Sequence, residues 1–271
     1  MTDDTTQADS EIVQLNLTRE GVAVVTLNRP QVHNAMNQDM INRLAEIFSD
    51  LSKTDQVRVV LLDGAGKSFS AGADLTWMRA AADYTESENL EDAMALAEML
   101  NRLWTMPKPT IALVHGAALA GGTGLAAACD MVVATKDASF GLTEVRLGII
   151  PSVISPYVLS AIGMRAAQRY FLTAERFDAT EAHRLGLVHV VVEDQNALAA
   201  EAERLTRTIF SCAPGAIGEA KALIRDVWGR EIDRDLMSDT ARRIARLRVG
   251  PEGREGLGAF LQKRKPSWIL D

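Results

Sequence analysis

The chain has little cysteine, few aromatic residues and no run of strongly apolar residues long enough for a membrane anchor. Among its 271 residues only Cys129 and Cys212 are cysteines, so no disulfide framework is encoded and a reducing compartment is expected. The most membrane-like stretch, 111–129, consists mainly of weakly apolar Ala and Gly and carries His115, so we expect no membrane span. The histidines are isolated from acids, and no metal site is expected.

An excess of positive charge is also missing. The formal net charge is −7, which disfavours nucleic acid and anionic membranes as partners. Residues 1–10 lack the basic start and apolar core of a signal peptide, so we expect a frayed tail on a cytoplasmic protein. The chain is 47% hydrophobic and 24% charged, which is typical of a globular protein with one large domain or a core plus an appendage.

Strand-like and helix-like segments alternate as far as residue 192. From about residue 195 helical patterns dominate, so the sequence predicts an α/β core over 11–195 and a helical region over 196–271. Asn37 and the pair Thr85 and Glu88 predict helix starts, and Gly186 predicts a helix end. The expected strands are 11–17, 22–28, 57–63, 110–115, 131–134 and 187–192, and the expected early helices are 38–52 and 85–104.

The glycine-rich stretch LAGGTGLAAACD, residues 119–130, follows one of these strands. It does not fit a phosphate-binding loop, because Leu125 stands where the lysine of such a loop would be and Ala127 breaks the dinucleotide-binding spacing. A helix N-terminus with exposed N–H groups fits better, since a substrate carbonyl could approach the backbone closely at Gly121 and Gly122. A plain packing turn is the alternative.

A second loop could supply a converging hydrogen-bond donor. The segment SFSAGADL, residues 68–75, leaves a buried strand, places Gly72 among small residues and enters a helix through Asp74. Two backbone donors that meet at one point would stabilise negative charge developing on a carbonyl oxygen.

Four segments together resemble the crotonase superfamily, also called the enoyl-CoA hydratase/isomerase family. They are SFSAGADL, VHGAALAGGTGLAAACD, ASFGLTEVRLGIIP and FLQKRKPSW, and the resemblance spans about residues 11–268. It implies an α/β spiral of repeated ββα units with a C-terminal helical region that packs trimers or dimers of trimers. It also implies an acyl-CoA thioester as the substrate, with no cofactor beyond the CoA that the substrate carries.

The resemblance also implies roles for individual residues. By motif position, the N–H groups of Ala73 and Gly121 hold the thioester oxygen, although Ala120 departs from the family's triple glycine. Lys67 is a candidate for a CoA phosphate, and Arg79 for a carboxylate on the acyl group. Further residues expected to contact substrate are Ala71, Gly72, Asp74, Gly122 and Gly124.

The carboxylates depart from the pattern of typical hydratases in the family, which have two glutamates. The first position, three residues after the oxyanion glycine, is Gly124 here, and the second is Glu144. One carboxylate in an apolar segment can move a proton between two carbons, or can serve hydration if other groups hold the water. A salt bridge between Glu144 and Arg146 is the structural alternative.

Residues 151–182 resemble the branch that includes methylglutaconyl-CoA and isohexenylglutaconyl-CoA hydratases. A glycine at 124 would enlarge the pocket for a branched acyl group or for ordered water. The expected function is therefore reversible hydration of a branched 2-enoyl-CoA by Glu144, Ala73 and Gly121. The alternatives are an enoyl-CoA isomerase that uses Glu144 alone, and a non-catalytic acyl-CoA- or RNA-binding member of the family.

Overall fold

A computed structural model describes residues 11–269, so the expected tail over residues 1–10 lies outside the described residues. Its centre is a six-stranded sheet with the order β1-β2-β3-β4-β6-β9. β1 and β2 form the expected hairpin, and every other neighbouring pair in this sheet is parallel. The strands are β1 (Val13–Leu17), β2 (Val22–Leu27), β3 (Val59–Gly64), β4 (Thr110–Val114), β6 (Met131–Thr135) and β9 (Val190–Val192).

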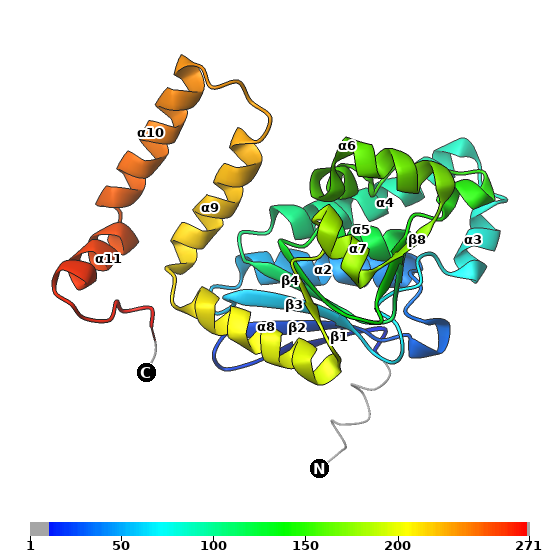
Figure 1. The fold of residues 1–271 in the computed structure, drawn as a ribbon, viewed down its shortest axis with the longest axis horizontal. Coiled ribbons are helices and arrows are strands. Elements are labelled where there is room, and N and C mark those ends of the chain that lie inside the picture. Colours follow the sequence, from blue (N-terminus) through cyan, green and yellow to red (C-terminus); the bar gives the residue numbers. More distant parts are fainter. Residues whose placement is uncertain (1–10, 270–271) are drawn as a thin grey trace, which may run out of the picture.

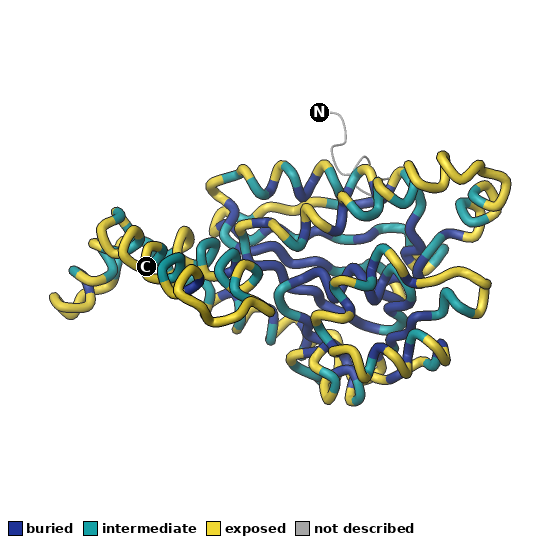
Figure 2. Tube along the Cα trace, turned by 90° about the horizontal axis from the view of Figure 1, so that it is seen from above, coloured by how far each residue is buried: buried dark blue, intermediate teal, exposed yellow. Residues whose placement is uncertain are grey.

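The central strands are continuous apolar runs because helices cover both faces of the sheet (Figure 1). On one face lies the larger core cluster, which includes buried side chains of α2 (Gln38–Lys53) and α4 (Glu86–Thr105). On the other face lies a smaller cluster, in which Leu198 and Ala202 of α8 (Gln195–Phe210) pack against strand residues. Figure 2 shows the buried positions concentrated in the strands and the helix faces against them.

A second, three-stranded sheet stands beside the first and was not expected from the sequence. It comprises β5 (Ala117–Leu119), β7 (Ser139–Gly141) and β8 (Arg176–Asp178), with β5 parallel to β7 and β7 antiparallel to β8. Their sequences, AAL, SFG and RFD, are too short to show a period and, unlike that of β9, do not lie in an apolar β-branched run. Helix α5 (Gly121–Ala127) begins two residues after β5 ends, so this small sheet fixes where the glycine-rich stretch lies.

The helix-start signals in the sequence are confirmed. The Asn37 side chain accepts from the Met40 N–H at 3.1 Å, and Thr85 with Glu88 forms a capping box at α4. Met94 of α4 is 49% exposed, because the twenty-residue helix is longer than the strands that it covers. The other helices before residue 195 are η1 (Pro30–Val32), α3 (Leu75–Ala81), η2 (Glu144–Leu147), α6 (Ser155–Thr173) and α7 (Ala179–Leu185).

The compact unit extends past the expected boundary at 195/196, because α8 contributes to the core of the sheet. Only after α8 does the chain leave the body, as α9 (Pro214–Val227), α10 (Arg234–Val249) and α11 (Pro251–Leu261) (Figures 1 and 2). No helix in residues 11–269 combines the length and the apolar character that crossing a membrane would need.

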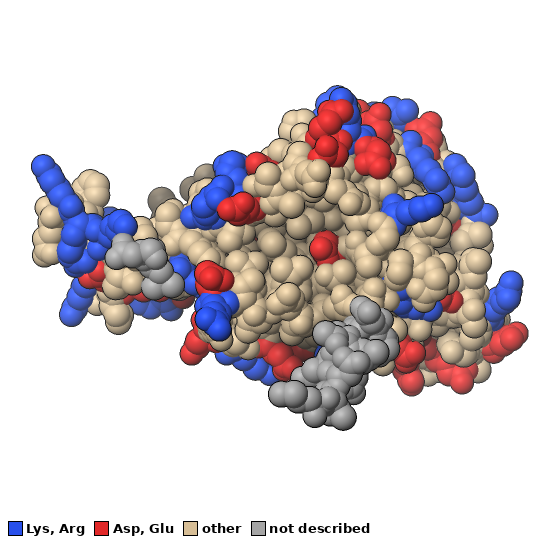
Figure 3. All heavy atoms as spheres, turned by 90° about the horizontal axis from the view of Figure 1, so that it is seen from below, with Lys and Arg blue, Asp and Glu red and all other residues tan. Residues whose placement is uncertain are grey.

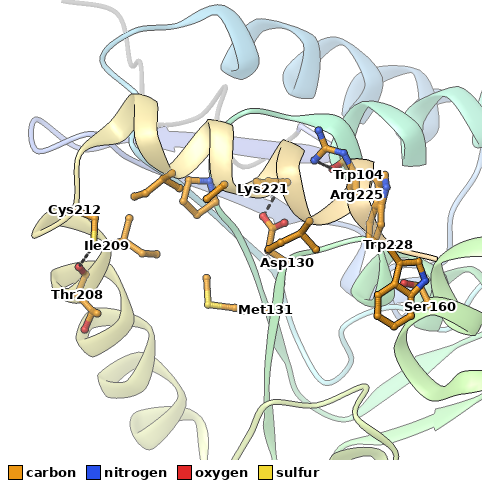
Figure 4. A pocket seen from close by; sticks show the side chains of 14 residues that line it. Trp104, Asp130, Met131, Ser160, Thr208, Ile209, Cys212, Lys221, Arg225 and Trp228 are labelled. Carbon is orange, nitrogen blue, oxygen red and sulfur yellow. Dashed lines mark hydrogen bonds and ion pairs between the residues drawn. The ribbon is translucent and has the colours of Figure 1, made fainter. Parts of the chain in front are cut away.

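Polar contacts made by basic side chains attach the C-terminal helices to the core, among them those of Arg58, Lys221 and Arg225. Arg58, next to β3, donates to the carbonyl oxygens of Phe210, Cys212 and Trp268 at 3.2, 3.0 and 3.0 Å. Lys221 of α9 is buried and donates to Asp130 at 2.6 Å (Figure 4). Asp130 also accepts from the backbone N–H and the hydroxyl of Thr110, so its carboxylate joins β4, β6 and α9.

We predict that Lys221→Met destabilises the protein by about 1–3 kcal/mol, because the carboxylate of Asp130 loses its buried cationic partner. The measurement is chemical denaturation at neutral pH. Lys136→Met is the matched control, since Lys136 pairs with Glu193 on the surface and should change stability by less than about 1 kcal/mol. Equal effects of the two substitutions would contradict the structural role given to Lys221.

Candidate active site

A cavity of about 360 Å³ lies where the loop 68–74, the start of α5, η2 and the segment before α6 meet. Its lining is mostly apolar and includes one carboxylate, that of Glu144. The residues that line it are Met36, Ala71, Ala73, Leu75, Trp77, Met78, Leu96, Ala120, Gly121, Thr143, Glu144, Leu147 and the segment 149–154. Four of the expected site residues, Ala71, Ala73, Gly121 and Glu144, therefore share one cavity.

The loop 68–74 is held between two other segments by backbone hydrogen bonds. On one side, Ser70 donates its N–H to Ala117 at 2.9 Å and accepts from the Leu119 N–H at 2.9 Å. On the other side, Met36 donates to the carbonyl of Gly72 at 2.7 Å and accepts from the Asp74 N–H at 2.8 Å. The loop is thus a short extra strand, and its position relative to β5 is fixed.

This pattern aims the Ala73 N–H away from Met36. Met36 pairs with Ala73 as an isolated parallel bridge, in which the two residues flanking Ala73 make the hydrogen bonds. Among the described residues, the Ala73 N–H has no protein acceptor, and Ala73 lines the cavity. This N–H group is therefore free to donate to a ligand.

Gly121 supplies the second candidate donor, as the first residue of α5. The N–H groups in the first turn of a helix have no acceptor inside the helix, and the structure gives none for Gly121 in residues 11–269. A Cβ at Gly122 would lie 2.5 Å from the carbonyl oxygen of Ser70, so glycine there allows the helix start to contact the loop 68–74. Gly121 lines the same cavity as Ala73, so both candidate donors belong to one site.

Ala120 has a backbone conformation that glycine adopts more readily, with φ 49° and ψ −117°. A non-glycine residue in such a region costs roughly 1–3 kcal/mol. Its N–H donates to the Gly141 carbonyl at 2.7 Å, and this bond holds the turn against β7. The turn before Gly121 is therefore formed even though Ala120 replaces the first glycine of the family's triple glycine.

Glu144 starts η2, and its side chain reaches into the cavity. Its Oε2 atom is buried and has no hydrogen-bond partner among the described residues. The expected alternative, a salt bridge with Arg146, is absent there, because Arg146 donates to the Ala174 carbonyl at 2.8 Å instead. Burial raises the pKa of Glu144, and a hydrogen bond with its own backbone opposes this to a lesser degree. A carboxyl in this state is suited to exchange protons.

Asp74 does not line the cavity, and its contacts are structural. It caps α3 by accepting from the N–H groups of Thr76 and Trp77, and it pairs with Arg29 at 2.9 Å. Burial raises the pKa of Asp74, but these hydrogen bonds and the Arg29 charge together lower it below the usual value. Because Asp74 is adjacent to Ala73 in the chain, these contacts also fix the position of the Ala73 N–H.

Several other expected contacts fall outside the cavity lining. Lys67 and Arg79 are exposed, on the loop before Ser68 and on α3. Gly72, at φ 97°, and Gly122 have no side chain, which allows the loop 68–74 and the start of α5 to contact each other. The described part of the chain places no lysine or arginine in the lining, so a carboxylate on the acyl group would have no cationic partner there.

The expectation that Gly124 enlarges the pocket is wrong. A Cβ at Gly124 would lie 2.1 Å from Cγ2 of Ile154, so the side chain of Ile154 fills that volume. Sequence reasoning missed Ile154 because the contact joins two segments thirty residues apart. It also missed Asn34, which is fully buried and donates to the carbonyls of Ala65 and Ser68, both at 2.8 Å. The available signal was the asparagine itself in the turn after the hairpin, because asparagine tolerates the left-handed backbone, φ 54°, that this position adopts.

The comparisons with known proteins identify the family. The model of the enoyl-CoA hydratase/isomerase family matches residues 18–269. A short-chain-enoyl-CoA hydratase from Clostridium acetobutylicum is 35% identical over 258 residues, which are 94% of this chain and 97% of the relative. A crotonyl-CoA hydratase from Syntrophomonas wolfei is 33% identical over 252 residues, 92% of this chain and 95% of the relative.

Solved structures of enoyl-CoA hydratases are also similar to this chain. The crystal structure of an enoyl-CoA hydratase from Shewanella pealeana matches with a TM-score of 0.93 and 42% identity, and the match covers 98% of this chain and 100% of that one. The spiral α/β fold with C-terminal helices that the sequence predicted is therefore confirmed. The chain belongs to the enoyl-CoA hydratase/isomerase family.

Proposed function

We propose that the protein catalyses the reversible addition of water to a 2-enoyl-CoA thioester. The observation that carries this proposal is the presence of two free backbone donors, at Ala73 and Gly121, and one partly buried carboxyl, Glu144, in a single apolar cavity. The names of the relatives from Clostridium acetobutylicum and Syntrophomonas wolfei support the same reaction.

The two backbone donors would act on the thioester oxygen. Addition of hydroxide at C3 moves electron density through C2 to that oxygen, which becomes an enolate. Fixed donors bind this charge more strongly than they bind the neutral ground-state carbonyl, and each is worth about 3 kcal/mol in comparable sites. The loop 68–74 and α5 hold the donors in place before substrate binds, so little reorganisation is needed.

Glu144 would move the protons. Its carboxylate accepts one proton from the attacking water, whose oxygen bonds to C3, and the resulting carboxyl returns a proton to C2 of the enolate. Glu144 ends in the state in which it started, so one carboxylate balances the reaction. The raised pKa brings its acid and base forms closer in free energy at neutral pH, as a proton carrier requires.

The second candidate is double-bond isomerisation, and a specific observation favours it. In the described residues Glu144 is the one carboxylate in the cavity, and the position of the family's other glutamate is covered by Ile154. An isomerase needs a single group that takes a proton from C2 of a 3-enoyl-CoA and returns it to C4. Non-catalytic acyl-CoA binding has less support. A partly buried carboxyl without a partner costs stability, and carboxyls in that state are concentrated at catalytic sites.

The acyl group that we propose is apolar. The lining around Glu144 consists largely of aliphatic side chains, among them Leu96, Ile150 and Ile154. A methylglutaconyl-like substrate was expected from residues 151–182, from the place left by Gly124 and from Arg79. Of these three supports only the resemblance of residues 151–182 remains, because Ile154 fills the place beside Gly124 and Arg79 is exposed.

Self-association into a trimer or a dimer of trimers is part of the proposal. The helices that leave the body carry large apolar side chains that are more than half exposed. One face of the protein has a broad area with few charged side chains (Figure 3). Such surfaces are uncommon on monomers. The exposed side chains on these helices and on the connection between α9 and α10 include Ile224, Trp228, Ile232, Leu257, Phe260 and Leu261.

The reaction is tested by a panel of crotonyl-CoA, its 3-enoyl isomer and methylglutaconyl-CoA, with the products separated by chromatography. We expect crotonyl-CoA to yield a 3-hydroxyacyl-CoA. Glu144→Gln should lower kcat by at least ~100-fold, because the side chain can no longer carry a proton, while acyl-CoA binding persists. Conversion of the 3-enoyl substrate alone would replace hydratase by isomerase, and near-normal turnover in the variant would remove Glu144 from the mechanism.

The same variant should report on stability. Because burial raises the pKa of Glu144 above its usual 4.5, the folded state holds the proton more tightly than the unfolded state. The free energy of unfolding therefore falls as pH rises through 4.5 towards the raised value, and that loss is absent in Glu144→Gln. Denaturation at several pH values should show that the free energy of unfolding of Glu144→Gln increases relative to that of the wild type as pH rises. A constant difference would mean that Glu144 titrates normally.

Self-association is tested by light scattering on the full chain, where we expect the mass of a trimer or hexamer. Truncation after Ala213 keeps α8 in the core and should yield a smaller species. A native, active monomer of the full chain would contradict the proposal.

A further inference from the structure

The place beside Gly124 is occupied, although glycine has no side chain. A Cβ built on Gly124 would lie 2.1 Å from Cγ2 and 2.5 Å from Cβ of Ile154. Carbon atoms that are not bonded normally stay about 3.5–4.0 Å apart. Ile154 and any side chain at position 124 therefore exclude one another in this fold.

Ile154 is well placed to shape the cavity. It stands directly before α6, is 3% exposed and contributes to the cavity lining, so it separates the cavity from the buried face of α5. Its carbonyl accepts from the Val158 N–H at 3.1 Å, which ties it to the first turn of α6. The branched Cβ restricts rotation about χ1, so the side chain cannot readily swing out of the way.

The position along α5 indicates which part of a substrate Ile154 would meet. Gly124 lies three residues after Gly121, which is one helical turn on the same face and about 4.5 Å along the axis. If the Gly121 N–H binds the thioester oxygen, Ile154 lies beside the acyl carbons that follow the thioester carbon.

We infer that Ile154 is a specificity-determining residue that, through its contact with Gly124, closes the acyl pocket against groups branched next to the double bond. The inference rests on the proposed function and deepens it. The preferred substrate class is a 2-enoyl-CoA whose apolar chain is unbranched at C4. Ile154 acts by occupying volume and takes no part in proton transfer.

The first test compares two substrates, crotonyl-CoA and 4-methylpent-2-enoyl-CoA. Ile154→Ala should raise the ratio of kcat/KM for the branched over the straight substrate by about tenfold or more, because three side-chain carbons leave the pocket wall. Ile154→Val should raise the ratio by less. Val158→Ala is the control, since Val158 is fully buried in α6 and does not line the cavity. The ratio of this variant should stay at the wild-type value.

An unchanged ratio in Ile154→Ala and Ile154→Val, or an equal rise in Val158→Ala, would overturn the inference. Binding of the saturated analogues butyryl-CoA and 4-methylpentanoyl-CoA, measured by calorimetry, gives the same comparison without turnover. If the wild type hydrates neither substrate, the proposed function fails, while the calorimetric ratio still decides whether Ile154 limits the pocket.

The second test uses the mutual exclusion of the two positions. Gly124→Ala should lower the Tm of the wild-type protein, because its methyl group collides with Ile154. The same substitution should raise the Tm of Ile154→Gly, where no side-chain atom remains at position 154 to collide with the methyl group, and where alanine favours the helix. It should also return part of the substrate ratio towards the wild-type value. A change of Tm with the same sign in both backgrounds would overturn the inference.

Discussion

The candidate site depends on the hydrogen bonds that hold the loop 68–74 between the segment around Met36 and strand β5. Ser70 is bonded to Ala117 and Leu119, while Gly72 and Asp74 are bonded to Met36. These contacts place Ala73 beside the start of α5, a segment that follows some fifty residues later in the chain. Without these contacts the N–H groups of Ala73 and Gly121 would not converge on one thioester oxygen. Glu144 alone would not position an acyl thioester.

The rest of the site is built around that contact by close packing. Gly122 lets the helix approach the Ser70 carbonyl, and Gly72 adopts φ 97° where the loop passes Leu119. Asp74 and Arg29 secure the far end of the loop, and the Ala120 N–H secures the turn against β7. Glu144 is then introduced into an apolar wall, where burial raises its pKa. Burial of the carboxyl makes it a better proton carrier but lowers the stability of the fold, and the packing of the surrounding core offsets that loss.

Much of this could be predicted from the sequence, and the exceptions have physical causes. Apolar runs and caps predicted the hairpin, β3, β4, β6, α2 and α4, because these signals are local. The three-residue strands β5, β7 and β8 could not be found, since their hydrogen bonds depend on distant partners. Ala73, Gly121 and Glu144 were assigned by motif and do share the cavity. The role of Gly124 was misjudged because it depends on Ile154, and the role of α8 because its apolar face is matched only by the assembled sheet.

The central claim is that two backbone N–H groups polarise a thioester carbonyl before any chemistry occurs. Infrared difference spectroscopy on bound acyl-CoA, with the thioester carbonyl labelled with ¹³C, measures this polarisation directly. Hydrogen bonding by both donors predicts that the carbonyl stretch moves to a lower frequency on binding, and that Glu144→Gln retains the shift because the donors belong to the backbone. A labelled carbonyl that absorbs at the same frequency in the bound and the free ligand would contradict the account.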